Sequence, residues 1–83
     1  MKYNFIIFNQ DPNREPVEQQ RSSKFSYEEL KTIVGGPIEI IQADKSHIFV
    51  VCGDGWLRKF IPNPHMPQFC GQILYTDIKL INM

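Results

Sequence analysis

The segment 26–42 constrains the fold most, because it contains a helix start, a helix stop and the beginning of a strand. Ser26 precedes Glu29 by three residues, the spacing of a capping box in which each side chain bonds the backbone amide of the other residue. Phe25 and Leu30 stand at the two positions of a hydrophobic staple. Apolar residues recur at helical spacing, which predicts an amphipathic helix of roughly two turns. Such a short helix is unstable alone, so it must pack on a sheet.

Gly35 and Gly36 end the predicted helix, because glycine readily adopts the left-handed conformation and the following Pro37 cannot continue a helix. A Gly-Gly pair can also bind an anion through its backbone amides. This pair follows a helix, however, where the macrodipole is unfavourable for phosphate, and we interpret it as a turn. Residues 38–42 then form a strand, and the proline at its start suits an edge position.

Other segments have the composition of strands. Residues 2–8 are apolar on both sides, which is typical of a strand that lies centrally in a sheet, or between a helix and a partner surface. Residues 47–52 form the most β-like run of the chain, and the pattern predicts a hairpin that joins them through Gly53-Asp54-Gly55 to residues 56–60. Residues 69–83 form either one long strand or two short ones.

The segment 9–24 is mostly polar. Its first half contains Asp-Pro-Asn and is typical of a loop. Residues 17–22 either pair with the first strand as an edge or form a mobile linker into the helix, and we favour the hairpin. The sequence therefore predicts a single α+β domain over residues 1–83, with a small, mostly antiparallel sheet of about five strands and one short helix packed on a face.

Composition narrows the possible partners of this 83-residue chain. Nine basic and nine acidic residues give a net charge of zero, so we expect no nucleic-acid partner. The apolar runs are too short for a transmembrane helix, and the first residues are typical of a strand rather than a signal peptide. We therefore expect a cytoplasmic protein with no membrane partner. Cys52 and Cys70 can in principle pair, but in that setting we expect two reduced thiols.

Catalytic and metal-binding patterns are weak in this sequence. His47, Cys52, His65 and Cys70 lack the paired spacing of zinc sites. His65 and Cys70 also lack the strand-turn-helix elbow or oxyanion motif that would accompany a nucleophile pair. Neither a P-loop nor a dinucleotide fingerprint occurs. We predict that the chain is not an enzyme and has no catalytic residue, no metal site and no cofactor.

A binding surface is the remaining candidate site. Trp56, Arg58 and Lys59 lie on the last predicted strand of the hairpin, and Asn63 and His65 lie in the stiff, proline-rich loop that follows. Tryptophan and arginine are the residue types most enriched at binding hot spots. An indole, a guanidinium and an amide can stack on and hydrogen-bond a nucleotide, or anchor a protein partner. In the alternative interpretation Trp56 is a core residue and Arg58 lies at its rim.

Several motifs resemble those of a family of small domains of unknown function, found mostly in phages, plasmids and integrated elements of bacteria. They are Tyr27-Glu28-Glu29-Leu30, Val34-Gly35-Gly36 with Ile38-Glu39, Asp54-Gly55-x-Leu57, and Pro62-Asn63. The resemblance covers most of the chain but consists of turn and core signals. Gly71-Gln72-Ile73 departs from the final strand motif of the family by a displaced glycine. The resemblance implies a bacterial host cytoplasm and a small accessory protein that binds and disables host machinery or sequesters host signals.

Two functions follow as expectations. The first is a non-enzymatic binding protein of phage or mobile-element type, which interferes with a host defence factor by protein–protein binding. The second is an oligomeric sponge that sequesters a nucleotide-like signal between subunits, through Arg58, Asn63 and Trp56. A chain of this size buries a limited core, so we also expect a homodimer or a higher homo-oligomer.

Overall fold

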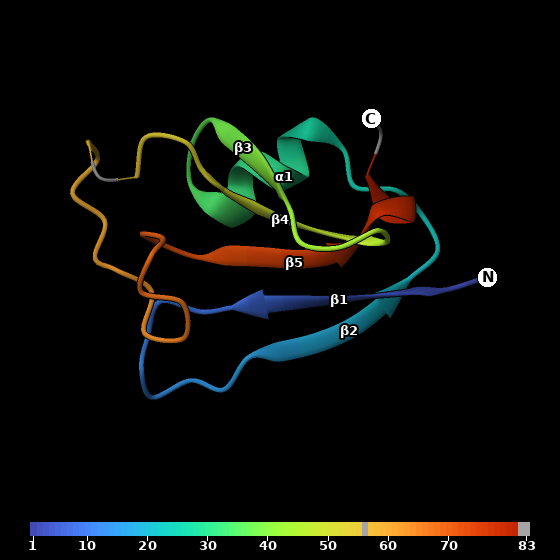
Figure 1. The fold of residues 1–83 in the computed structure, drawn as a ribbon, viewed down its shortest axis with the longest axis horizontal. Helices are drawn as coiled ribbons and strands as arrows, with labels where there is room; N and C mark the ends of the chain where they lie inside the picture. Colours follow the sequence, from blue (N-terminus) through green and yellow to red (C-terminus); the bar gives the residue numbers. More distant parts are fainter. Residues whose placement is uncertain (56, 82–83) are drawn as a thin grey trace.

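A five-stranded antiparallel sheet carries one short helix on one of its faces, in a computed structural model that describes residues 1–55 and 57–81 (Figure 1). The fold is α+β, as predicted. Its strands lie in the order β2-β1-β5-β4-β3. In chain order the elements are β1 (Tyr3–Phe8), β2 (Val17–Arg21), α1 (Tyr27–Val34), β3 (Ile38–Gln42), β4 (His47–Cys52), β5 (Ile73–Asp77) and a 3-10 turn, η1 (Ile78–Leu80).

Helix α1 begins and ends where the sequence predicts. The Ser26 side chain accepts a hydrogen bond from the amide of Glu29 at 3.1 Å, and the Glu29 carboxylate accepts one from the amide of Ser26 at 3.0 Å. The capping box is therefore complete. Gly35 ends the helix with a left-handed backbone at φ 87°, and β3 follows directly.

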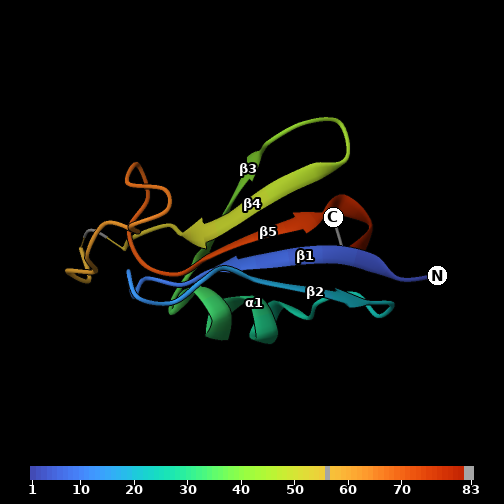
Figure 2. The same cartoon turned by 90° about the horizontal axis from the view of Figure 1, so that it is seen from below.

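The helix packs mainly over β3, β4 and β5 and lies on one side of the sheet (Figure 2). The main core lies on this side of the sheet. Phe25, Leu30 and Val34 bury their side chains there. Residues of the sheet on the same side are also excluded from water, and η1 closes the end of the core. The buried residues contributed by strands and by the C-terminal turn are Phe5, Ile48, Val50, Cys52, Leu74, Leu80 and Ile81.

The strand positions confirm three of the predictions. β1 lies inside the sheet, between β2 and β5, as its two apolar sides indicate. β2 pairs with β1 as an antiparallel edge, so the hairpin interpretation of residues 17–22 is confirmed. β3 is the opposite edge, and Pro37 stands at its start.

The predicted hairpin from residues 47–52 to 56–60 is wrong. β4 pairs with β3 on one side and with β5 on the other, so it has no free edge for a third strand. Residues 53–55 and 57–59 instead form turns, in which the amide of Arg58 donates to the carbonyl of Asp54 and that of Phe60 to Gly55. The Phe60 side chain folds back against the core.

The C-terminal segment is shorter in β structure than either alternative predicts. Among its described residues, 69–81, only 73–77 form a strand, and the chain then turns into η1, because the Asp77 side chain caps that turn by accepting from the amide of Lys79. In the part of the chain that the structure describes, no helix has the length and hydropathy needed to cross a membrane.

Candidate partner-binding surface

The sheet has a second face, which points away from α1, and a row of apolar side chains crosses it. In the antiparallel pairs Ile6 lies opposite Tyr75, Tyr75 opposite Phe49, and Phe49 opposite Ile41. Directly paired residues share a face of the sheet, so these four side chains form one continuous row over β1, β5, β4 and β3. We call the surface made by Ile6, Ile41, Phe49 and Tyr75 the open face.

The open face differs from the helix side in its exposure to water. Val50 and Leu74, which point toward the helix, are fully buried, whereas all four residues of the open face remain partly exposed. Among residues 1–55 and 57–81 no helix lies over this side, as Figure 2 shows. The open face is therefore a partly exposed apolar surface, of the kind that binds a partner.

Aromatic rings reinforce this row. The rings of Phe49 and Tyr75 have their centroids 5.0 Å apart, and Tyr75 also stacks on His47 at 5.1 Å with nearly parallel planes. Phe69 approaches Phe49 from the loop before β5, at 6.2 Å. Packed rings of this kind are rigid and lose little conformational entropy when a partner covers them.

One end of the same side is already covered by the chain itself. Val51 and Ile73 point this way too, but both are buried. Residues 68–70 lie against this region, since Phe69, Cys70 and Val51 line one small cavity. The loop thus closes one end of the sheet, while the open face lies beyond it.

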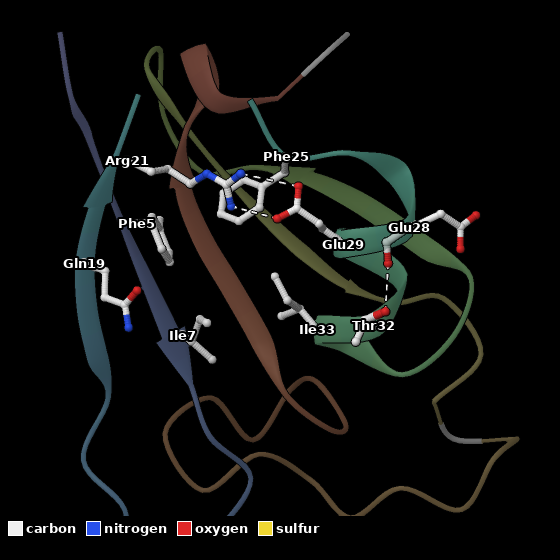
Figure 3. A pocket seen from close by; sticks show the side chains of 9 residues that line it. All are labelled: Phe5, Ile7, Gln19, Arg21, Phe25, Glu28, Glu29, Thr32 and Ile33. Atoms are coloured by element: carbon white, nitrogen blue, oxygen red, sulfur yellow. Dashed lines mark hydrogen bonds and ion pairs between the residues drawn. The ribbon is translucent and has the colours of Figure 1, made fainter. Parts of the chain in front are cut away.

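A groove lies on the opposite side, between α1 and the β1–β2 hairpin, where the helix leaves the sheet uncovered (Figure 3). Its volume is about 470 Å³. Phe5, Ile7 and Ile33 form an apolar floor, and Arg21 and Glu29 lie at one end. The remaining lining residues are Gln19, Phe25, Glu28 and Thr32.

Arg21 and Glu29 of this groove are paired with each other. Arg21 donates to both carboxylate oxygens of Glu29, at 2.9 and 3.3 Å, and to the backbone carbonyl of Ser23 at 2.8 Å. Its guanidinium also lies 4.2 Å from the centroid of the Phe25 ring. Every nitrogen of Arg21 that can donate is therefore engaged, and the groove offers no free arginine to an anion.

The described residues that the sequence predicts as a binding site lie in turns and loops. Trp56 lies outside the described residues. Arg58 and Lys59 lie in turns rather than on a strand, and Lys59 has φ 61°. Arg58 donates to Asp54 at 2.7 Å and lies across Gly36, where a Cβ would approach its Nε to 2.8 Å. This arginine thus links the turn to the end of the helix.

Asn63 is fully buried, although the sequence predicts that it lies in a surface loop. Its amide donates to the carbonyls of Phe8 and Gly71, at 2.9 and 2.8 Å, and its oxygen accepts from the amide of His65. The His65 ring is partly exposed, lies 3.2 Å from the carbonyl of Arg14 and approaches the ring of Phe8. Asn63 therefore holds loops together and has no exposed surface for a partner.

The thiols and carboxylates show no reactive arrangement in the described part of the chain. Cys52 and Cys70 are free, as predicted. Burial raises the pKa of the Cys52 thiol, whose sulfur donates to Asp54 at 3.2 Å. The Arg58 guanidinium, followed by this thiol, holds the pKa of Asp54 below its ordinary value of 3.8. Among residues 1–55 and 57–81 no cluster of three side chains fits a metal ion.

Comparison of the chain with protein-family models, curated proteins and solved structures finds no match. The resemblance to small phage and plasmid domains therefore stays a prediction, and the geometry of this chain carries the functional argument. The open face is the feature that the sequence analysis did not select. Its signal was present in the alternating apolar residues of β1, β4 and β5, but their shared row depends on strand order.

Proposed function

We propose that this protein is a small, non-catalytic binding protein that holds a protein partner on the open face. The observation that supports this proposal best is the row of Ile6, Tyr75, Phe49 and Ile41, partly exposed on an uncovered sheet. Aromatic and aliphatic residues gathered at the centre of a surface are typical of protein interfaces. The resemblance to phage and plasmid domains supports a host protein, such as a defence factor, as the partner.

The sponge hypothesis receives less support from the geometry. It requires Arg58 and Asn63 to hold a nucleotide-like ligand, but Arg58 is paired with Asp54 and the Asn63 amide already makes three hydrogen bonds inside the fold. The groove beside α1 likewise offers no unpaired arginine. A protein partner needs none of these groups.

Site-specific photo-crosslinking in bacterial cells tests this proposal. The photoreactive residue p-benzoylphenylalanine replaces Tyr75 in one variant and Tyr27 in the matched control. Tyr27 is 53% exposed, but it lies on α1, on the other side of the sheet. We expect light-dependent adducts from position 75 and few from position 27. The mass of each adduct distinguishes another protein from a second copy of the chain.

Adducts from position 27 alone, or equal adducts from both positions, would contradict the proposal. A second variant then checks the role of the apolar row. Ile41→Lys changes a residue of the row two strands away from position 75, and we expect it to remove the adduct without altering the far-UV circular dichroism spectrum. An adduct that persists in this variant would show that the apolar row does not bind the partner.

A further inference from the structure

We infer, on the basis of the proposed function, that the open face takes a protein surface whose apolar centre is bordered by lysine or arginine. The inference rests on the charges that surround the row. Glu18 on β2 lies directly opposite Ile6, and so stands at one end of the row. Glu39 on β3 lies two residues from Ile41 and therefore shares its side of the sheet. Both carboxylates are exposed.

Acidic residues thus occupy both edge strands of the same side. Asp77 adds a further carboxylate, since it pairs with His47 across β4 and β5. No lysine or arginine stands at any described strand position that points this way. Those positions are Asn4, Ile6, Phe8, Glu18, Gln20, Glu39, Ile41, His47, Phe49, Val51, Ile73, Tyr75 and Asp77.

The distance between the two edges indicates the size of the partner. Four strand spacings of about 4.8 Å separate β2 from β3, so Glu18 and Glu39 stand roughly 20 Å apart. A single small ligand cannot reach both carboxylates while it covers the apolar row. A protein surface with an apolar centre and basic residues on two sides can do so, because interfaces commonly have this core-and-rim arrangement.

The same charges disfavour two other occupants. An anionic ligand, such as a nucleotide or a nucleic acid, would meet carboxylates on both edges of the sheet. A second copy stacked face to face with aligned strands would place Glu18 or Glu39 against another glutamate at each edge, whichever way it is turned. Basic side chains of a partner would instead be attracted to the carboxylates at both edges of the sheet.

Two synthetic helical peptides test this inference. They share one pattern of leucines, and their polar positions carry lysine in one peptide and glutamate in the other. We expect the leucine–lysine peptide to bind on the order of tenfold more tightly in low salt, with most of that preference lost at high salt. Calorimetry gives the affinities, and amide chemical shifts in β4 and β5 locate the binding.

Matched variants separate the charge effect from the apolar contact. We expect Glu18→Gln with Glu39→Gln to remove most of the preference for the lysine peptide. Glu28→Gln removes an exposed carboxylate of α1, and we expect it to leave the preference for the lysine peptide unchanged. We expect Ile41→Thr to weaken binding of both peptides. Thermal unfolding of each variant checks that the fold is retained.

Each result has a distinct meaning. Equal binding of both peptides at the open face would overturn the inference about charge but leave the proposed function standing. A preference for the glutamate peptide, or one abolished by Glu28→Gln alone, would also overturn it, as would a stable dimer that covers β4 and β5. Binding of neither peptide, or shifts confined to α1 and β2, would overturn both the inference and the proposed function.

Discussion

At the scale of single residues, Asn63 shows how burial changes the role of a polar side chain. It belongs to a segment with three prolines, which is typical of an exposed loop. In the structure its amide bonds three backbone groups, from β1, from the loop before β5 and from its own loop. These partners are distant in the sequence, so the chain gives no local signal of them.

Asn63→Ala tests this structural role. The substitution leaves the carbonyls of Phe8 and Gly71 without their donor in a buried region, and we expect a loss of about 3 kcal/mol in the free energy of unfolding. Urea denaturation measures it. His65→Ala is the matched control, because its backbone amide still donates to Asn63, and it should cost less than about 1 kcal/mol. Equal losses would contradict the role given to Asn63.

The lowered pKa of Glu29 predicts how the stability of the fold depends on pH. The hydrogen bonds from Arg21, followed by the bond from the amide of Ser26, hold the pKa of the Glu29 carboxyl below its ordinary value of 4.5. Because the folded state lowers this pKa, the carboxylate stabilises the fold above pH 4.5, and this contribution is lost as the pH falls below 4.5 and through the lowered value. We expect the melting temperature to fall over that range.

Glu29→Gln provides the comparison for this pH dependence. Glutamine can keep the hydrogen bond of the capping box, but it has no charge to titrate. We expect a lower melting temperature at pH 7 and a smaller decrease between pH 5 and pH 3, measured by circular dichroism. A variant with the same pH profile as the unmodified protein would show that the Arg21–Glu29 pair does not contribute.

At the scale of elements, the helix and its two ends were predictable because their signals are local. A capping box, a staple and a terminal glycine each depend on residues within one turn of each other. β1, β3 and β4 were likewise visible in short apolar runs. The segment after β4 was not, because Gly-Asp-Gly is equally compatible with a hairpin and with the successive turns seen here, and only the pairing of β4 decides between them.

Gly35→Ala tests the end of the helix. At φ 87° a side chain is strained, and a Cβ would approach the Phe60 ring to 3.2 Å. We expect a loss of about 1–2 kcal/mol in the free energy of unfolding, measured by urea denaturation. Gly53→Ala is the control, since its Cβ would meet its nearest atoms at an ordinary 3.7 Å. It should change stability by less than about 0.5 kcal/mol; an equal effect at both positions would contradict the strain argument.

At the scale of the whole molecule, the strand order determines which residues can act together. The sequence predicted an α+β fold and its single helix, and it placed the candidate site at Arg58, Asn63 and their neighbours. The open face could not be predicted from the sequence, because its residues Ile6, Ile41, Phe49 and Tyr75 come from four strands. Their common row exists only once β5 lies between β1 and β4.

That placement of β5 also has a consequence for the order of folding. The β1–β2 and β3–β4 pairs are hairpins between neighbours in the chain, and each can form as soon as its own residues have left the ribosome. β5 is the last of these five strands to be made, and in the folded sheet it lies between the two hairpins. Until then no strand pairing joins the two hairpins, and the surface proposed to hold the partner does not exist. A nascent chain therefore cannot engage its partner before synthesis has passed residue 77.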